Sequence, residues 1–201
     1  MRLNAALAIA ACANEGLEEE KAKEALQNFC GVQRRSQVHF ETAFLTLFED
    51  YAHHPKELKA LNSAIEEQYD PYYKIAVFQV HRYERLERYV KEFAKELKNF
   101  DKIFLAPPFS AWSERSDTPS LEELRKLLGP KAEVFDSEDW EYNAEKVLAQ
   151  TPTTEHTIIS VIGAATVKEI IPWLKHQLIS HILSERLPDL QVIHEIGRAH
   201  V

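Results

Sequence analysis

Residues 74–106 read KIAVFQVHRYERLERYVKEFAKELKNFDKIFLA, and this stretch decides the fold class. It opens with the apolar run 74–79, which is typical of a strand buried inside a parallel sheet. Residues 84–98 then repeat apolar side chains at helical spacing, which predicts an amphipathic helix. A second apolar strand follows at 102–106. A strand, a helix and a strand in this order predict a right-handed crossover between two parallel strands.

The same alternation continues on both sides of this unit. Upstream, we expect strands at 37–42 and 44–49 and a helix that begins at Pro55. Downstream, we expect helices at 120–128, 137–149 and 166–179, strands at 132–135 and 156–162, and a loop over 107–119, because Pro107-Pro108 should end the strand before it. Such alternation predicts an α/β, Rossmann-like three-layer domain with a mostly parallel sheet, over residues 37–181.

The two ends of the chain differ from this pattern. Residues 3–14 and 18–29 are expected to form two short helices separated at Gly16, so residues 1–36 form a helical segment of their own. Residues 182–201 are expected to be a tail, and its last six residues resemble one reading frame of a sequencing adapter.

Composition excludes several classes of function. A net charge of -8 argues against a broad nucleic-acid surface, which needs a basic face. No run reaches the ~18 apolar residues of a membrane span, and the Ala-rich start fits a helix better than a secretion signal. Cys12 and Cys30 lack metal-ligand spacing, so we expect a reduced, cytoplasmic protein with no metal site of its own.

The first chemical signal is Asp50-Tyr51-Ala52-His53-His54-Pro55, between an expected strand and an expected helix. Ligands of open α/β sheets bind at the carboxyl ends of strands, which is where this turn should lie. A carboxylate, a phenol and two imidazoles offer contacts to a nucleotide or a carboxylate. A solvated turn that merely caps the next helix is the alternative.

The second signal is His81-Arg82-Tyr83-Glu84-Arg85, at the end of the next strand. Arg82 and Arg85 are three residues apart at a helix start, so both can face an anion. A surface helix with Arg–Glu pairs is the alternative. Because both turns end strands that follow one another in the chain, they should converge at one edge of the sheet.

A third signal, Gln33-Arg34-Arg35, lies just before the first strand, where an arginine could reach a phosphate. The alternative is a solvated linker. The order of these motifs along the chain resembles the C-terminal part of the Mur ligases. The motifs are Asn4, the Phe29–Gly31 segment, the Arg34-Arg35 pair and the two polar turns. The double-His turn and the His-Arg-Tyr-x-Arg run resemble the branch that joins L-alanine to UDP-N-acetylmuramate, with the murein-peptide branch close behind.

The resemblance implies roles for individual residues, although it assigns no catalytic residue with certainty. The nucleotide would be contacted by Asn4, Arg35, Asp50 and His53. The incoming amino acid would be surrounded by Tyr51, His81, Arg82 and Arg85, with the arginines holding its carboxylate.

The resemblance also implies an ATP- and Mg²⁺-dependent reaction, in which an acyl phosphate is attacked by the amine of the amino acid. No G-x-x-x-x-G-K-[ST] loop occurs here, so ATP and Mg²⁺ would be bound mainly by a central domain that is absent. Residues 1–36 would be the end of that domain, and the chain should be inactive alone. The segments 106–110 and 162–165 depart from the family pattern. A stand-alone nucleotide- or amino-acid-binding module and a partner-binding domain without a ligand remain alternatives.

Overall fold

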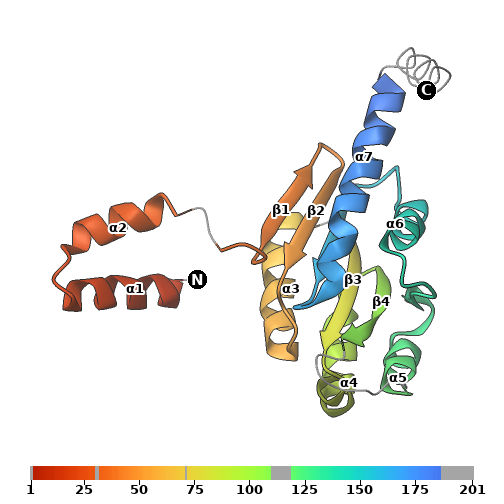
Figure 1. The fold of residues 1–201 in the computed structure, drawn as a ribbon, viewed down its shortest axis with the longest axis horizontal. Helices are drawn as coiled ribbons and strands as arrows, with labels where there is room; N and C mark the ends of the chain where they lie inside the picture. Colours follow the sequence, from red (N-terminus) through yellow and green to blue (C-terminus); the bar gives the residue numbers. More distant parts are fainter. Residues whose placement is uncertain (1, 30–31, 71, 110–118, 187–201) are drawn as a thin grey trace, which may run out of the picture. The chain divides into compact units, whose positions relative to one another are not determined.

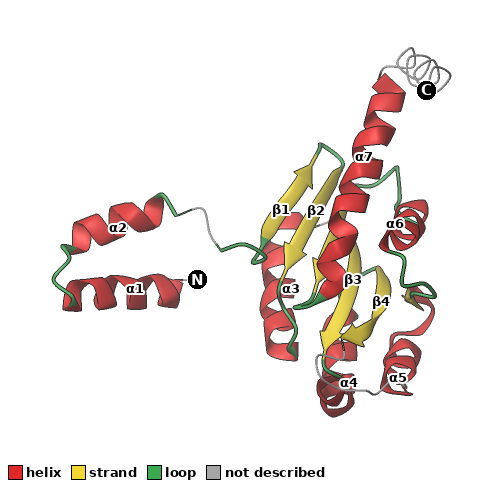
Figure 2. Cartoon of the chain, viewed as in Figure 1, coloured by secondary structure: helices red, strands yellow, loops and turns green. Residues whose placement is uncertain are grey.

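The computed structural model describes residues 2–29, 32–70, 72–109 and 119–186. By its internal contacts the chain divides into two compact units, Met1–Gln33 and Arg34–Val201. The division falls three residues before the expected boundary at 37, because Arg34 is tied by its side chain to the second unit. Figure 1 and Figure 2 show the elements of both units.

The first unit consists of two helices, α1 (Arg2–Asn14) and α2 (Glu19–Gln27). Gly16 has a φ of 84° and ends α1 as expected, since the left-handed backbone lets the Leu17 amide donate to the Cys12 carbonyl. Of the residues of α2, Ala22 is buried. The two expected helices are confirmed, and α2 is shorter than predicted by one residue at its start and two at its end.

The second unit is built on a six-stranded sheet in the order β1-β2-β6-β3-β4-β5. The strands are β1 (Gln37–Glu41), β2 (Leu45–Asp50), β3 (Tyr73–His81), β4 (Lys102–Phe109), β5 (Ala132–Val134) and β6 (Thr157–Ile162). β1 runs antiparallel to β2, and every other neighbouring pair is parallel. The expected mostly parallel sheet is therefore confirmed.

Helices cover both faces of this sheet (Figure 2). One face packs against α3 (Pro55–Tyr69), α4 (Tyr83–Leu97) and α5 (Pro119–Leu128), and the other against α6 (Trp140–Ala149) and α7 (Ile170–Arg186). The central strand β6 serves both layers, because Ile158 and Ile162 enter the first core while Ile159 and Val161 enter the second. This arrangement confirms the three-layer α/β class.

Two short 3₁₀ turns complete the unit, η1 (Gly129–Lys131) and η2 (Thr166–Glu169). The last helix therefore begins with a 3₁₀ turn, and α7 continues to Arg186, beyond the expected end at 179. The helix expected at 137–149 begins at Trp140, because the Asp139 carboxylate caps it by accepting the amides of Glu141 and Tyr142.

One sequence prediction was wrong: Pro107-Pro108 does not end β4, which continues to Phe109. Successive N–H groups of a strand point to opposite edges. One of the two missing donors therefore faces the β5 side, where pairing with β4 ends at Leu105, and the other falls where the β3–β4 pairing is irregular. The β3–β4 register also shifts between Gln79 and His81, which absorbs one extra residue of β4. Of the expected loop at 107–119, residues 110–118 lie outside the described residues.

Glu133 joins the edge strand β5 to its neighbours, so its removal should reveal how the edge is held. Burial by itself raises the pKa of Glu133. Hydrogen bonds from Lys146 and Gln150, at 2.6 Å and 3.0 Å, together with the nearby Lys102, outweigh burial and lower the pKa to about 2.

Glu133→Gln should therefore cost about 1–2 kcal/mol of unfolding free energy at pH 7, after allowance for solvent screening of a partly exposed carboxylate. Because the folded-state pKa is depressed from 4.5 to about 2, this cost should shrink as the pH falls through that interval. Urea unfolding at pH 7 and pH 3 measures it. Glu145→Gln, an exposed change on α6, is the control, and a difference from wild type that does not vary with pH would contradict the assignment.

Candidate functional site

The carboxyl ends of β2, β3 and β6 meet at one edge of the sheet. β6 lies between β2 and β3 and runs parallel to both, so the two polar turns are separated by one strand and do not follow neighbouring strands. The expected convergence is nevertheless confirmed, since the imidazole rings of His53 and His81 lie 6.0 Å apart between centroids.

Four rings form a continuous row across this edge. Tyr51 contacts His53 edge-on at 5.2 Å, and His81 stacks on Phe109 at 5.8 Å with planes 21° apart. The Arg34 guanidinium lies 4.8 Å from the centroid of the Tyr51 ring, at the β2 end of the row. Phe109 was missed from the sequence because the strand that carries it was expected to end at Ala106.

The two imidazoles of the double-His turn have different surroundings: His54 caps a helix, and His53 belongs to the row of rings. His54 caps α3 by accepting the Lys56 amide, while the Glu57 carboxylate accepts the amides of His53 and His54. The capping alternative is thus correct for His54. His53 is half-buried, and its Nδ1 lies 2.9 Å from the Tyr51 carbonyl oxygen.

The second turn combines backbone strain with an unpaired cation. Arg82 has a φ of 76°, which is costly for a residue with a side chain, and its amide donates to the Phe109 carbonyl at 3.0 Å. The Nη1 atom of Arg85 is buried but has no hydrogen-bond partner in the described part of the chain. A buried guanidinium nitrogen without a partner is suited to an anionic ligand.

His81 lies beside these two arginines, and its environment favours the neutral ring. Burial lowers the pKa of His81 below its ordinary value of 6.5, and the charges of Arg85, Arg82 and His53 lower it further. The cluster therefore places cationic guanidiniums next to an uncharged imidazole at neutral pH.

The paired arginines before β1 behave differently from one another. Arg34 donates from Nε to Glu49 at 2.7 Å and from Nη2 to the Gly163 carbonyl at 2.9 Å. Arg35 is exposed and makes no hydrogen bond or ion pair among the described residues. Asp50 is also engaged within the domain, since its carboxylate accepts the amides of Ser36 and Ala52, each at 2.8 Å.

The second unit resembles known proteins in sequence and fold. The family model described as "Mur ligase, glutamate ligase domain" matches residues 34–169. The chain belongs to the Mur ligase family. A UDP-N-acetylmuramate–L-alanine ligase of Flavobacterium johnsoniae is 30% identical over 181 residues, which are 90% of this chain and 39% of that protein.

Two solved structures share the fold of this Mur ligase chain. The UDP-N-acetylmuramate–alanine ligase of Thermotoga maritima matches with a TM-score of 0.69 at 23% identity, over 89% of this chain and 37% of that one. E. coli FolC in complex with ADP matches with a TM-score of 0.65 at 21% identity, over 87% of this chain and 39% of that one. The chain thus spans about two fifths of the length of these proteins.

The remaining predicted contact, Asn4, lies on α1 in the first unit, outside the range 34–169 that the family model matches. Within the described ranges, no group of His, Cys, Asp and Glu side chains could hold a metal ion. No helix in those ranges is long and apolar enough to cross a bilayer.

The side chain of Gln79 links β3 to β4 and η2 next to this edge, a connection that the sequence did not reveal. Gln79 is buried, donates to the Pro107 carbonyl at 3.0 Å and accepts the Val167 amide at 2.9 Å. Gly163, directly after β6, passes so close that a Cβ there would lie 2.7 Å from the Gln79 carbonyl oxygen. Glycine after a strand was the one available signal.

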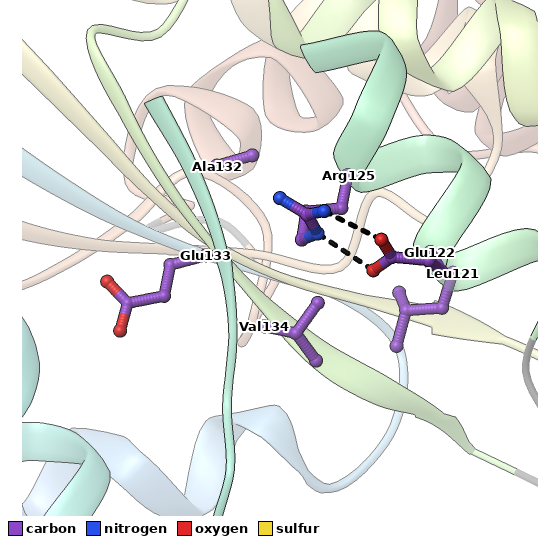
Figure 3. A pocket seen from close by; sticks show the side chains of 6 residues that line it. All are labelled: Leu121, Glu122, Arg125, Ala132, Glu133 and Val134. Carbon is purple, nitrogen blue, oxygen red and sulfur yellow. Dashed lines mark hydrogen bonds and ion pairs between the residues drawn. The ribbon is translucent and has the colours of Figure 1, made fainter. Parts of the chain in front are cut away.

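A separate pocket lies beside the edge strand, between α5 and β5 (Figure 3). It is lined by Leu121, Glu122, Arg125, Ala132, Glu133 and Val134. Arg125 is already neutralised there by hydrogen bonds of 2.7 Å and 2.6 Å to the Glu122 carboxylate. None of its lining residues belongs to the row of rings, so the pocket is not part of the candidate site.

Gly163→Ala should destabilise the Mur ligase domain by roughly 3 kcal/mol or more, because its φ of 151° and the Gln79 backbone leave no room for a methyl group. Gly129→Ala is the matched control. Gly129 also has a positive φ, 74°, but no atom within 4 Å, so it should lose only about 1 kcal/mol. Urea unfolding compares the two, and equal losses would show that the close approach is unimportant.

Arg85→Gln should raise the pKa of His81 toward its ordinary value, because it removes the larger of the two guanidinium effects. Titration of the His81 ring by NMR measures this, with the exposed Arg88→Gln on the same helix as control. Since the folded-state pKa lies below 6.5, the unfolded chain takes up the proton first on acidification, so His81 should reduce stability as the pH falls below 6.5. An unchanged pKa of His81 in Arg85→Gln would show that the charge of Arg85 does not influence the His81 ring.

Proposed function

We propose that this chain forms the amino-acid-contacting part of an ATP-dependent ligase of peptidoglycan precursor synthesis, which joins L-alanine to UDP-N-acetylmuramate. One observation carries the proposal: the His53 turn and the Arg82–Arg85 turn meet at a single edge, where a buried guanidinium nitrogen has no hydrogen-bond partner among the described residues. The name of the Flavobacterium relative supports the choice of substrates.

The charges of the cluster suit an amino acid as a zwitterion. Arg82 and Arg85 would hold its carboxylate, and the phenol of Tyr51 would border the same space. A neutral His81 would tolerate the ammonium group beside it, whereas a charged ring would repel it. Positioning of the amine in this way is the contribution expected of a domain to which no catalytic residue is assigned.

The nucleotide would lie toward β2, against Arg35, Asp50 and His53, with Asn4 contributing from the first unit. ATP supplies the phosphoryl group that activates the acceptor carboxylate. Arg35 fits a phosphate because it is exposed and uncommitted within the described residues. The sequence holds no Gly-rich phosphate loop, so ATP and Mg²⁺ would depend mainly on upstream domains.

This assignment extends to the organisation and location of the protein. Residues 1–36 would be the end of a central ATPase domain, 37–181 the C-terminal domain, and 182–201 a tail. The enzyme would act in the cytoplasm, where nucleotide-linked precursors and ATP are present, without a nucleic-acid or membrane partner.

The purified chain should form no product from UDP-N-acetylmuramate, ATP and L-alanine, because the phosphate loop is missing. A chimera that carries residues 34–186 in place of the matching part of the Flavobacterium ligase should form it. In that chimera Arg85→Ala should raise the KM for L-alanine roughly 10- to 100-fold, as expected for loss of a charge-assisted contact. Phosphate release and product formation measure both.

Arg88→Ala, exposed and one turn further along α4, is the matched control and should leave the KM for L-alanine unchanged. A folded chimera that hydrolyses no ATP in response to L-alanine would contradict the proposed substrate. Tight binding of ATP and L-alanine by the isolated chain in calorimetry, without ligation in the chimera, would instead favour a stand-alone binding module.

A further inference from the structure

The turn Arg34-Arg35-Ser36 is strained on both sides of its central residue. Arg34 has a φ of 62° and Ser36 a φ of 47°, both in the left-handed region that residues with side chains seldom adopt. Such a backbone conformation is unfavourable for a residue with a side chain and persists only where the surrounding structure enforces it. The conformation of this turn therefore needs identifiable anchors.

Arg34 is the first anchor. Its Nε donates to the Glu49 carboxylate at 2.7 Å, and Glu49 is 4% exposed, so the pair is shielded from water. The same carboxylate lies 2.7 Å from Nε2 of His39. The other guanidinium nitrogens donate to carbonyl oxygens of Gly163, Ala164 and Ala165, at 2.9 Å, 3.4 Å and 3.4 Å.

Ser36 is the second anchor, and Asp50 is its partner. The Ser36 amide donates to Oδ2 of Asp50 at 2.8 Å, while Oδ1 of the same carboxylate accepts the Ala52 amide. A further bond, from the Arg34 amide to Oε1 of Gln37 at 2.8 Å, closes the turn from inside. The carboxylate of Asp50 is thus occupied by the backbone of two different loops.

Arg35 alone in this turn is uncommitted. It is exposed and has no hydrogen bond or ion pair within the described part of the chain, although both of its neighbours are fixed. We propose that Arg34, Glu49 and Asp50 are positioning residues that hold Arg35 outward for contact with a phosphate group. The inference rests on the proposed function of Arg35. It implies that Asp50 influences phosphate binding indirectly, by holding the Ser36 amide and so fixing the turn that carries Arg35.

The inference is testable because it predicts that neutralising Glu49 or Asp50 weakens anion binding near Arg35, whereas a simple count of charges predicts tighter binding. Glu49→Gln and Asp50→Asn each remove a negative charge near Arg35, so electrostatics alone should tighten the binding of an anion. If the two carboxylates act by fixing the turn, their neutralisation should weaken it. In Asp50→Asn a single carbonyl oxygen faces the two amides of Ser36 and Ala52.

The experiment titrates the full 201-residue chain with inorganic tripolyphosphate, which lacks a nucleoside, and follows the Arg35 resonances by NMR at low salt. Arg35→Ala should abolish the response. Glu49→Gln and Asp50→Asn should each raise the Kd at least fivefold. Glu41→Gln, an exposed change on β1, removes a charge without touching the turn and should leave the Kd unchanged or lower.

Spectra of residues distant from the turn establish that each variant is folded. If Glu49→Gln does not fold, Asp50→Asn by itself tests the inference. Binding in Asp50→Asn as tight as wild type, or an Arg35 that does not respond in the wild-type chain, would overturn the inference. Ligation by the chimera is a separate readout, so normal ligation alongside unaltered tripolyphosphate binding in Asp50→Asn would remove the inference and leave the ligase function standing.

Discussion

The insertion of β6 between β2 and β3 is the constraint on which the rest of the domain depends. All six residues of β6 are buried, its backbone pairs on both sides, and both of its neighbours run parallel to it, as is typical of a strand inside a parallel sheet. The register sets Ile162 level with Asp50 on one side and with Phe78 on the other. β3 therefore extends three residues beyond β6, and this overhang carries Gln79 across the Gly163 turn and His81 to the edge.

The overhang explains why the candidate site contains strained backbone next to polar side chains. Gln79 joins β3 to β4 and η2, so the end of β3 is held from both sides. That support allows Arg82 to adopt a positive φ and the Nη1 atom of Arg85 to remain buried without a hydrogen-bond partner among the described residues. Strain and an orphaned cation are costly in an ordinary surface loop, and their occurrence together is typical of sites that bind a ligand.

Electrostatics in this protein are local. The chain is acidic overall, with a formal net charge of -8, yet arginines gather at the carboxyl edge of the sheet. Arg34 is neutralised by the buried Glu49, and removing one partner of such a pair costs about 3–5 kcal/mol because it leaves a buried charge. Arg35, Arg82 and Arg85 have no ion pair among the described residues, and under the proposed function they would be the cations of this edge that meet an anionic substrate.

The sequence by itself determined the alternation of strands and helices, since each element carries its own hydrophobic period, and it located both polar turns. It also supported the family, because the motifs around Asp50 and His81 are local. The tertiary structure alone decided that β6 separates β2 from β3, that β4 continues through two prolines to place Phe109 on His81, and that Arg34 is committed while Arg35 is not. These features depend on which strand lies beside which, and strand pairing is a non-local interaction that the pattern within a single segment does not record.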